Sequence, residues 1–176
     1  MFGFSNVFPT TTAGGGGAAV LPTFKILCKA DGNSCLTVRD GGAVLAPADS
    51  SDEHQHWFKD KRFATFVKDE EGKPAFALIN KATGLALQHF GNVKLVPYDP
   101  HYLDESVLWS KSGDMTEDFH YIRMVDEIYL NLNICDEGHH DKHHSGVQDG
   151  TKVVLSNWCK GDNQYWRMIP WSCLLS

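Results

Sequence analysis

The segment Asn163–Trp166, which reads Asn-Gln-Tyr-Trp, decides the fold that we predict for this chain. The same Gln-x-Trp ending occurs at Gln55–Trp57, and a further tryptophan, Trp109, stands between the two at nearly equal spacing. A repeat of this length is typical of supersecondary units that cannot bury their apolar faces alone and must share one core. We therefore predict one module written three times.

Short apolar runs precede each of these tryptophans in the same order. In the second run of each copy, such as Leu85–Gln88, apolar residues alternate with polar or small ones, which is typical of a strand with one buried face. Turn residues such as Lys81–Gly84 separate the runs. We predict an all-β fold, a β-trefoil with a barrel and a hairpin cap, because closure leaves no exposed sheet edge. Its repeats should span approximately 24–60, 75–110 and 119–171, with the three tryptophans in the shared core.

The length and charge of the chain limit the kinds of partner that we expect. The 176 residues suffice for one domain, which we place at 23–176, and residues 1–22, with their glycine run, are expected to form a flexible leader. The net charge is −6, and no Lys/Arg-rich segment is present to neutralise phosphates. Nucleic acid is therefore not an expected partner. No apolar run reaches the roughly 18 residues of a membrane span.

The cysteines favour a reducing compartment. There are five, an odd number without repeated spacing, which argues against a disulfide framework. Free thiols are the favoured state, with a bridge between Cys28 and Cys35 as the alternative. The first residues lack the basic start of a secretory signal, and no Asn-x-Ser/Thr acceptor occurs. We expect a cytoplasmic and nuclear location.

Several segments resemble one family of plant proteins, the Euonymus-type lectins, and the threefold Gln-x-Trp layout is similar to the wider group of ricin-B-like lectins. The segments that carry the resemblance are Gln55–Asp60, Leu95–Tyr98, Leu103–Trp109 and Trp158–Gln164. The resemblance covers nearly all of residues 24–171. It implies a β-trefoil carbohydrate-binding module of the nucleus and cytoplasm, with glycans or glycoproteins as partners, no catalysis and no required cofactor. It leaves a homo-oligomer open.

The residue types that a sugar site requires gather in the third copy. A sugar offers pairs of hydroxyl groups on its edge and a patch of C–H groups on one face, so its site needs amides or carboxylates and an aromatic ring. In the first copy, Glu53–Gln55 keeps part of the pattern, and in the second, Glu105–Val107 has lost the amides. We therefore predict one main carbohydrate site, formed by Asn133, Asp136, Trp158, Asn163 and Gln164.

Two of these residues have structural alternatives. Gln164 is as well explained by a backbone bond in the trefoil core as by sugar contact. For Trp158 a stacking surface is favoured, with packing beneath a loop as the alternative. The third copy also departs from the ricin-type pattern, with Asn133 where an aspartate is usual and Ser156 at the usual aromatic position. Because Asn lacks the charge that strengthens bonds to hydroxyls, we expect about millimolar affinity for a single sugar, worth about 4 kcal/mol.

The run His139–His144 is the other conspicuous motif. Its histidines are types that ligate zinc, copper or nickel, but a polar loop without fixed spacing favours a solvated segment, and we predict no metal site. If these histidines line the sugar site, their protonation near pH 6.5 makes binding depend on pH. No catalytic motif is present. The alternative function is a non-catalytic protein-interaction β-trefoil with a degenerate sugar site.

Overall fold

The computed structural model describes residues 21–113, 117–135, 147–159 and 161–171. Within these residues the chain forms twelve strands and three 3-10 turns. Asp136, the run His139–His144 and Cys173 lie outside the described residues, as does almost all of the predicted leader 1–22. The expectations that concern them stay predictions.

Each repeat contributes four strands, with a 3-10 turn before the last. The first repeat holds β1 (Phe24–Cys28), β2 (Asp31–Arg39), β3 (Gly42–Pro47), η1 (Glu53–Gln55) and β4 (Trp57–Asp60). The second holds β5 (Ala77–Asn80), β6 (Leu85–His89), β7 (Val93–Pro97), η2 (Glu105–Val107) and β8 (Trp109–Lys111). The third holds β9 (Ile122–Met124), β10 (Glu127–Ile134), β11 (Thr151–Asn157), η3 (Asp162–Gln164) and β12 (Trp166–Pro170).

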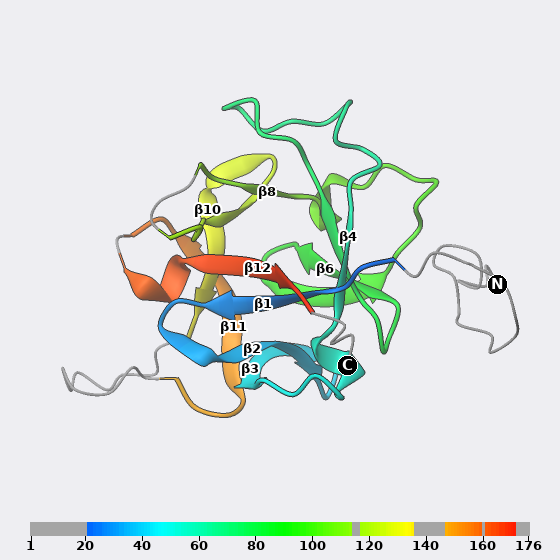
Figure 1. Cartoon of the computed structure of the whole chain (residues 1–176). Coiled ribbons are helices and arrows are strands. Elements are labelled where there is room, and N and C mark those ends of the chain that lie inside the picture. The colour runs from blue at the N-terminus through cyan, green and yellow to red at the C-terminus, as the bar shows by residue number, and fades with distance from the viewer. Residues whose placement is uncertain (1–20, 114–116, 136–146, 160, 172–176) are drawn as a thin grey trace, which may run out of the picture.

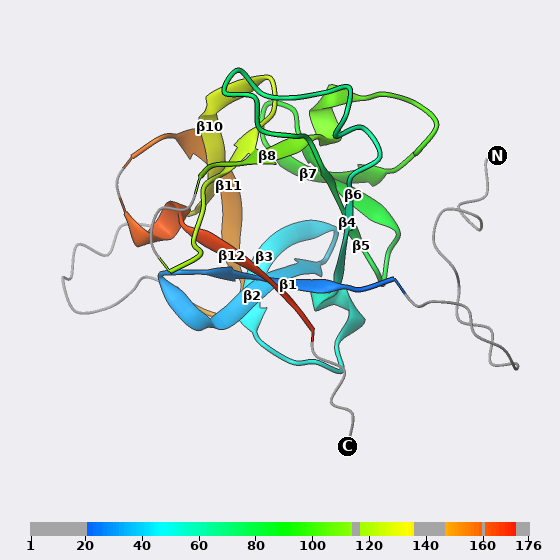
Figure 2. The same cartoon turned by 45° about the horizontal axis from the view of Figure 1, so that its top comes forward.

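The first and last strands of the three repeats form a closed ring. β1 pairs with β4 and β12, β4 with β5, and β8 with β9, all antiparallel. Two backbone bridges complete the ring, Phe76 with Trp109 in the second repeat and His120 with Trp166 in the third. Every barrel strand in the described part of the chain therefore has a neighbour on both sides. The predicted β-trefoil is confirmed, and Figure 2 shows β1 and β12 side by side.

The two middle strands of each repeat form a hairpin: β2 with β3, β6 with β7, and β10 with β11. Thr151 of β11 pairs with Leu45 of β3, which ties the first hairpin to the third. These hairpins supply the predicted cap. The first strand of each hairpin, such as β10 with Asn133, also lies beside the 3-10 turn of the same repeat.

The three repeat tryptophans fill the shared core, as predicted. Each is at most 1% exposed, and all three belong to one apolar cluster. Each indole N–H also donates a hydrogen bond to a backbone carbonyl in the second strand of its own repeat: Trp57 to Leu36 at 2.9 Å, Trp109 to Leu87 at 3.0 Å, and Trp166 to Leu132 at 3.0 Å. The ring thus fills the core and fixes its own hairpin at the same time.

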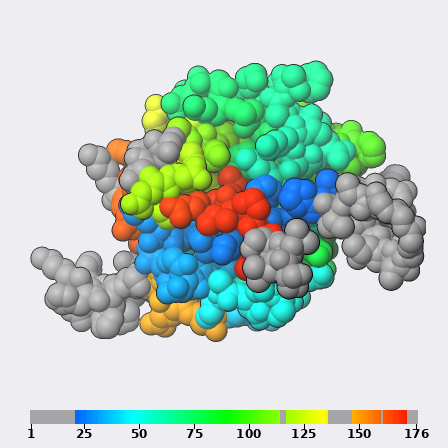
Figure 3. Space-filling view, viewed as in Figure 1, coloured from blue at the N-terminus to red at the C-terminus, as the bar shows by residue number. Residues whose placement is uncertain are grey.

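The long connection between β4 and β5, residues 61–76, covers the top of the molecule in Figure 3. Phe63 and Val67 anchor it in a second apolar cluster that includes Tyr98 and Leu108 of the second repeat. The connection therefore lies against the barrel, where its charged residues meet those of later strands.

The described cysteines are free, as predicted, and none forms a disulfide. Burial raises the pKa of Cys28 to about 12 and that of Cys35 to about 11, so both thiols stay protonated at neutral pH. The alternative bridge between them is not formed. No helix in the described part of the chain is long and apolar enough to cross a membrane.

Candidate functional site

Gln164 is fully buried, so its amide contacts protein rather than solvent. Its Oε1 accepts a hydrogen bond from the backbone N–H of Cys159 at 2.9 Å. Its Nε2 donates to the backbone carbonyl of Asn157 at 2.8 Å. The side chain therefore fastens the connection between β11 and η3. This is the structural alternative that the sequence left open for Gln164, and it leaves no exposed atom for direct sugar contact.

Gln55 has the same role in the first repeat. Its Oε1 accepts from the backbone N–H of Asp49 at 2.8 Å, and its Nε2 donates to the carbonyl of Pro47 at 2.9 Å. It is 2% exposed. The glutamine of the Gln-x-Trp ending is thus a structural clamp in both copies that carry it.

The exchange Gln164→Ala is expected to lower the free energy of unfolding by about 2 kcal/mol, because it leaves a buried N–H and a carbonyl without partners. Urea unfolding measures this loss. Gln88→Ala is the matched control, since the Gln88 amide donates to the hydroxyl of Ser106 rather than to backbone. Its cost should stay below about 1 kcal/mol. Equal losses for the two variants would contradict the clamp.

Asn133 and Ser156, the two departures from the ricin-type pattern, contact each other. Asn133 Nδ2 donates to Ser156 Oγ at 2.8 Å, and Gln164 Nε2 donates to the same hydroxyl at 2.9 Å. Asn133 Oδ1 is buried and has no hydrogen-bond partner in the described part of the chain. Ser156 therefore joins the two amides, and one acceptor of Asn133 remains unused.

Asn163 lies in the middle of η3 and is half-buried. Its backbone carbonyl lies 3.7 Å from the thiol sulfur of Cys28, beside β1. Among the described residues, its side-chain amide has no hydrogen-bond partner. The amide of Asn163, unlike that of Gln164, is thus no part of the buried clamp among the described residues.

Trp158 lies at the surface, with 49% of its area exposed. Its backbone N–H donates to the carbonyl of Tyr129 at 2.8 Å, and its indole meets the ring of Tyr121 edge-on, with centroids 6.2 Å apart. Burial, followed by the hydrogen bond with Tyr165, raises the pKa of Tyr121 to about 12, so the phenol beside the indole stays neutral. The alternative that Trp158 packs beneath a loop does not occur.

The ring of Trp158 lines a groove of about 670 Å³, which we call the Trp158 groove. A second exposed ring, that of Tyr129 at 66%, lies in the same groove. Its charged residues come from β9 and from the β4–β5 connection. The groove residues that bear on binding are Trp158, Tyr121, Tyr129, Arg123, Glu70 and Glu71.

Arg123 brings opposite charges together at this groove. It is 6% exposed, and its Nη2 lies 2.7 Å from a carboxylate oxygen of Asp69, while Nη1 bonds to the carboxylate of Glu71. Burial alone would raise the pKa of Asp69. The hydroxyl of Ser110, then the backbone N–H groups of Lys73 and Glu71, and last the charge of Arg123 hold that pKa below its usual range. The groove thus presents fixed charged donors and acceptors beside two exposed rings.

The structure therefore separates the residues that the sequence grouped into one site. Asn133 and Gln164 belong to the buried amide network, while Trp158 lines a groove that neither Asn133 nor Asn163 lines. Asp136 lies outside the described residues. Sequence reasoning missed Tyr129, Arg123 and Glu71, because nothing local in the sequence places them next to Trp158.

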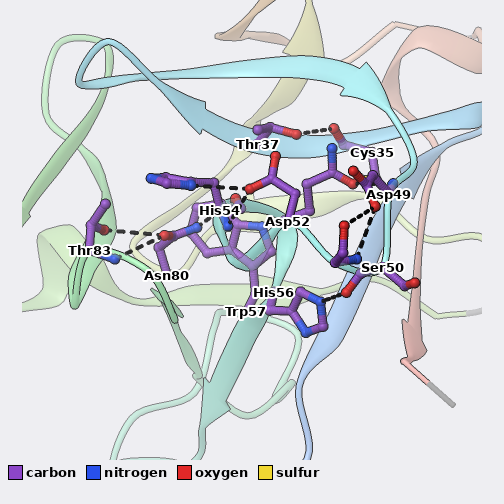
Figure 4. A network of polar contacts seen from close by, with 12 residues as sticks. Cys35, Thr37, Asp49, Ser50, Asp52, His54, His56, Trp57, Asn80 and Thr83 are labelled. Atoms are coloured by element: carbon purple, nitrogen blue, oxygen red, sulfur yellow. Dashed lines mark hydrogen bonds and ion pairs between the residues drawn. The ribbon is translucent and has the colours of Figure 1, made fainter. Parts of the chain in front are cut away.

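In the first repeat a groove of about 350 Å³ is lined by Thr37 and His54, which hold the places of Asn133 and Asn163 in the third. His54 precedes the buried Gln55 as Asn163 precedes Gln164. The Asp52 carboxylate accepts from the backbone N–H of His54 at 3.0 Å and lies 3.1 Å from its ring Nδ1. Figure 4 shows both side chains near Thr37 of β2. We call this the His54 groove; its signal in the sequence is an acidic residue two positions before the histidine.

The second repeat has lost this arrangement, as the sequence indicates. Gln88 donates to the hydroxyl of Ser106 at 2.9 Å, and that hydroxyl donates to Asp104 at 2.6 Å. Val107, 4% exposed, takes the place of the clamping glutamine. The polar side chains of this repeat bond to one another.

The described residues contain no group of three or more His, Cys, Asp or Glu side chains placed to hold a metal ion. That statement does not reach the run His139–His144, which lies outside them. The expectation of a solvated histidine loop therefore stays a prediction.

The closed six-strand ring, the three hairpins and the equivalent tryptophans define a β-trefoil. A ricin B-like lectin of Macrolepiota procera, solved in complex with lactose, is similar in fold, with a TM-score of 0.60 at 20% identity over 88% of this chain and 99% of that one. The designed threefold-symmetric protein ThreeFoil has a TM-score of 0.59 at 19% identity, over 84% of this chain and 97% of that one.

Curated sequences identify the family. The ricin B-like lectin R40G3 of Oryza sativa subsp. japonica is 54% identical over 154 residues, which cover 85% of this chain and 74% of that protein. This chain belongs to the ricin B-like lectin family. The ricin B-like lectin EULS3 of Arabidopsis thaliana, an Euonymus-type lectin, is 48% identical over 169 residues, which cover 94% of this chain. The predicted family is therefore confirmed.

The chain is shorter than several of these relatives. It spans 51% of the length of EULS3. It spans 43% of the rice ricin B-like lectin R40C1, to which it is 57% identical over 154 residues that cover 85% of this chain. No family model matches the chain.

Proposed function

We propose that this chain is a non-catalytic carbohydrate-binding lectin domain whose main glycan site lies in the third repeat. Its membership of the ricin B-like lectin family supports sugar binding in general. The single observation that carries the proposal is the exposed ring of Trp158 on the wall of a groove. Exposed apolar surface that is rimmed by polar residues is typical of ligand-binding grooves, and the C–H face of a sugar is a natural partner for an indole ring.

The rest of the Trp158 groove supplies what the edge of a sugar requires. Sugar hydroxyls both donate and accept hydrogen bonds, and the paired Arg123 and Glu71 offer a donor and an acceptor side by side. Tyr129 extends the apolar wall beyond one ring. A groove of this size holds more than one sugar unit. The preferred ligand is therefore an oligosaccharide rather than a monosaccharide.

Glycan-array binding followed by titration of one bound oligosaccharide tests the proposal. Trp158→Ala is expected to weaken binding at least about tenfold, the equivalent of 1.4 kcal/mol. Because the Trp158 side chain is half-exposed, the melting temperature of the Trp158→Ala variant should stay within about 2 °C of that of the wild-type protein. Tyr102→Ala is the matched control, since Tyr102 is 68% exposed and does not line the Trp158 groove. It should bind normally.

The variants Asn163→Ala and His54→Ala test which repeat holds the main glycan site. Loss of binding with Asn163→Ala extends the third-repeat site to η3. Loss with His54→Ala, and none with Trp158→Ala, would move the main site to the first repeat and overturn the proposal. A folded wild-type protein that binds no glycan on the array would instead favour the alternative, a protein-interaction module.

A further inference from the structure

A strongly basic groove of about 370 Å³ lies beside the barrel, at the β4–β5 connection. We call it the lysine groove. Lys59 comes from β4, Lys61 and Lys73 come from the β4–β5 connection, and Lys111 comes from β8. The connection and β8 lie in the upper part of Figure 1, and β4 leads up to them. The residues that matter for its chemistry are Lys59, Lys61, Lys73, Lys111, Phe76 and His120.

No carboxylate in the described part of the chain forms a close ion pair with the lysines of this groove, although the charge of Asp118 acts on Lys111 from farther away. None of the four takes part in an ion pair there. This is unusual in a chain with a net charge of −6. Nearby carboxylates bind other groups: Asp60 binds Arg62 and Tyr98, Asp69 and Glu71 bind Arg123, and Asp118 binds His120. Glu70 lines the Trp158 groove instead.

Lys59 is the lysine of the groove whose charge is most affected by its surroundings. Its ammonium group lies 4.6 Å from the centre of the Phe76 ring, on an apolar floor. Burial, then the charges of Lys111 and Lys61, lowers the pKa of Lys59 to about 8. The positive charges in this groove therefore repel one another, and a bound anion would relieve that repulsion.

We propose that the lysine groove binds a phosphate dianion, either free or carried on a small molecule such as a sugar. Lysine ammonium groups are compact point charges, and several that converge from different strands suit the oxygens of a tetrahedral oxyanion. A planar carboxylate would instead be matched by an arginine fork. The groove contains no arginine.

The size and surroundings of the groove limit the ligand. A volume of about 370 Å³ holds a phosphorylated sugar, whose carbon skeleton would lie on Phe76 and Pro74. An extended polyanion such as nucleic acid would meet the net negative charge of the rest of the molecule. The prediction that nucleic acid is no partner thus fits a small anion site.

Isothermal titration with inorganic phosphate and with glucose 6-phosphate tests this site at pH 7 and low salt, with glucose and matched sodium chloride as blanks. Both phosphates should bind saturably, and the tighter of the two identifies the source of the ligand. Lys61→Gln/Lys111→Gln should weaken binding at least about tenfold. The melting temperature of this double variant should match or exceed that of the wild-type protein, because the substitutions remove like charges that repel one another.

The matched control is Lys94→Gln/Lys152→Gln, which removes the same charge from exposed lysines of β7 and β11 that do not line the groove. It should retain wild-type affinity for phosphate. Equal weakening in both double variants would show an effect of net charge alone. That result, or no saturable binding up to about 20 mM, would overturn the proposal.

Two pH-dependent quantities give a second test of the site: the affinity for phosphate, and the titration of the lysine side chains followed by NMR. The groups that face Lys59 are Lys61, Lys73, Lys111, His120 and, beyond it, Asp118. A phosphate monoester, with its second pKa at about 6, is already a dianion above pH 7. A loss of affinity for glucose 6-phosphate as the pH rises through about 8 therefore reports on Lys59. Bound phosphate should raise the pKa of Lys59. An unchanged pKa in the presence of saturating phosphate would contradict the site.

Discussion

Trp109→Ala is expected to lower the free energy of unfolding by about 4 kcal/mol, the largest effect of any single substitution considered for this protein. Trp109 is fully buried in the cluster shared by the three repeats, and a buried His89 meets its ring edge-on at 4.8 Å between centroids. Its loss leaves a cavity that three repeats surround, so no single hairpin can move to fill it. Small domains are stable by only about 5–15 kcal/mol, so the variant is expected to unfold at markedly lower urea concentration.

Trp109→Phe separates the two roles of the ring. Phenylalanine keeps most of the apolar volume but cannot donate to the carbonyl of Leu87. Its cost should be about 2 kcal/mol, between those of the wild type and the alanine variant. Trp158→Ala is the matched control, because 49% of that indole is already exposed, and it should cost less than about 1 kcal/mol. A loss for Trp109→Ala no larger than this control would contradict a shared core.

The fold was predictable because its signals are local and repeated. The three repeat tryptophans mark where each last strand begins, and the alternation in segments such as Leu85–Gln88 marks a strand. The predicted single buried face does not hold in β6, because Ala86 and Leu87, on opposite faces, are both fully buried. Three copies of one weak signal reinforce one another. The buried role of Gln164 was only an alternative, because the sequence does not show that Cys159 and Asn157 would supply its partners.

The candidate sites were less predictable, because barrel closure brings their residues together. The Trp158 groove combines Trp158 with Tyr129 of the preceding hairpin strand and with Glu71 of the β4–β5 connection, which belongs to another repeat. The lysine groove is a cluster in space, whereas a search for Lys/Arg-rich segments finds only clusters in sequence. Asn133 and Ser156 look like two separate losses in the sequence, yet they bond to each other and form one coupled change.

Arg123→Met is expected to lower the free energy of unfolding by about 3 kcal/mol, because it leaves the buried carboxylate of Asp69 without its guanidinium partner. This loss of free energy should lie near the lower end of the range of about 3–5 kcal/mol that is typical of a broken buried ion pair. The reason is that two backbone N–H groups still donate to Asp69 at 2.9 Å. Arg39→Met is the matched control. Its ion pair with Asp149 is exposed and should be worth less than about 1 kcal/mol.

The pH dependence of this loss identifies its cause. In the wild-type protein the pKa of Asp69 lies below its usual range, so its contribution to stability is present above about pH 4 and is lost as the pH falls through the lowered pKa. Without Arg123 that pKa rises part of the way toward its unfolded value, because the hydroxyl of Ser110 and two backbone N–H groups still lower it, and the contribution shrinks by the share due to Arg123. The difference in unfolding free energy between the two proteins should therefore be largest at pH 7 and should diminish below pH 4. Urea unfolding at pH 7, 5 and 3 measures it. A difference that stays constant over this range would mean that Arg123 stabilises the β4–β5 connection by packing, and that its charge on Asp69 contributes little.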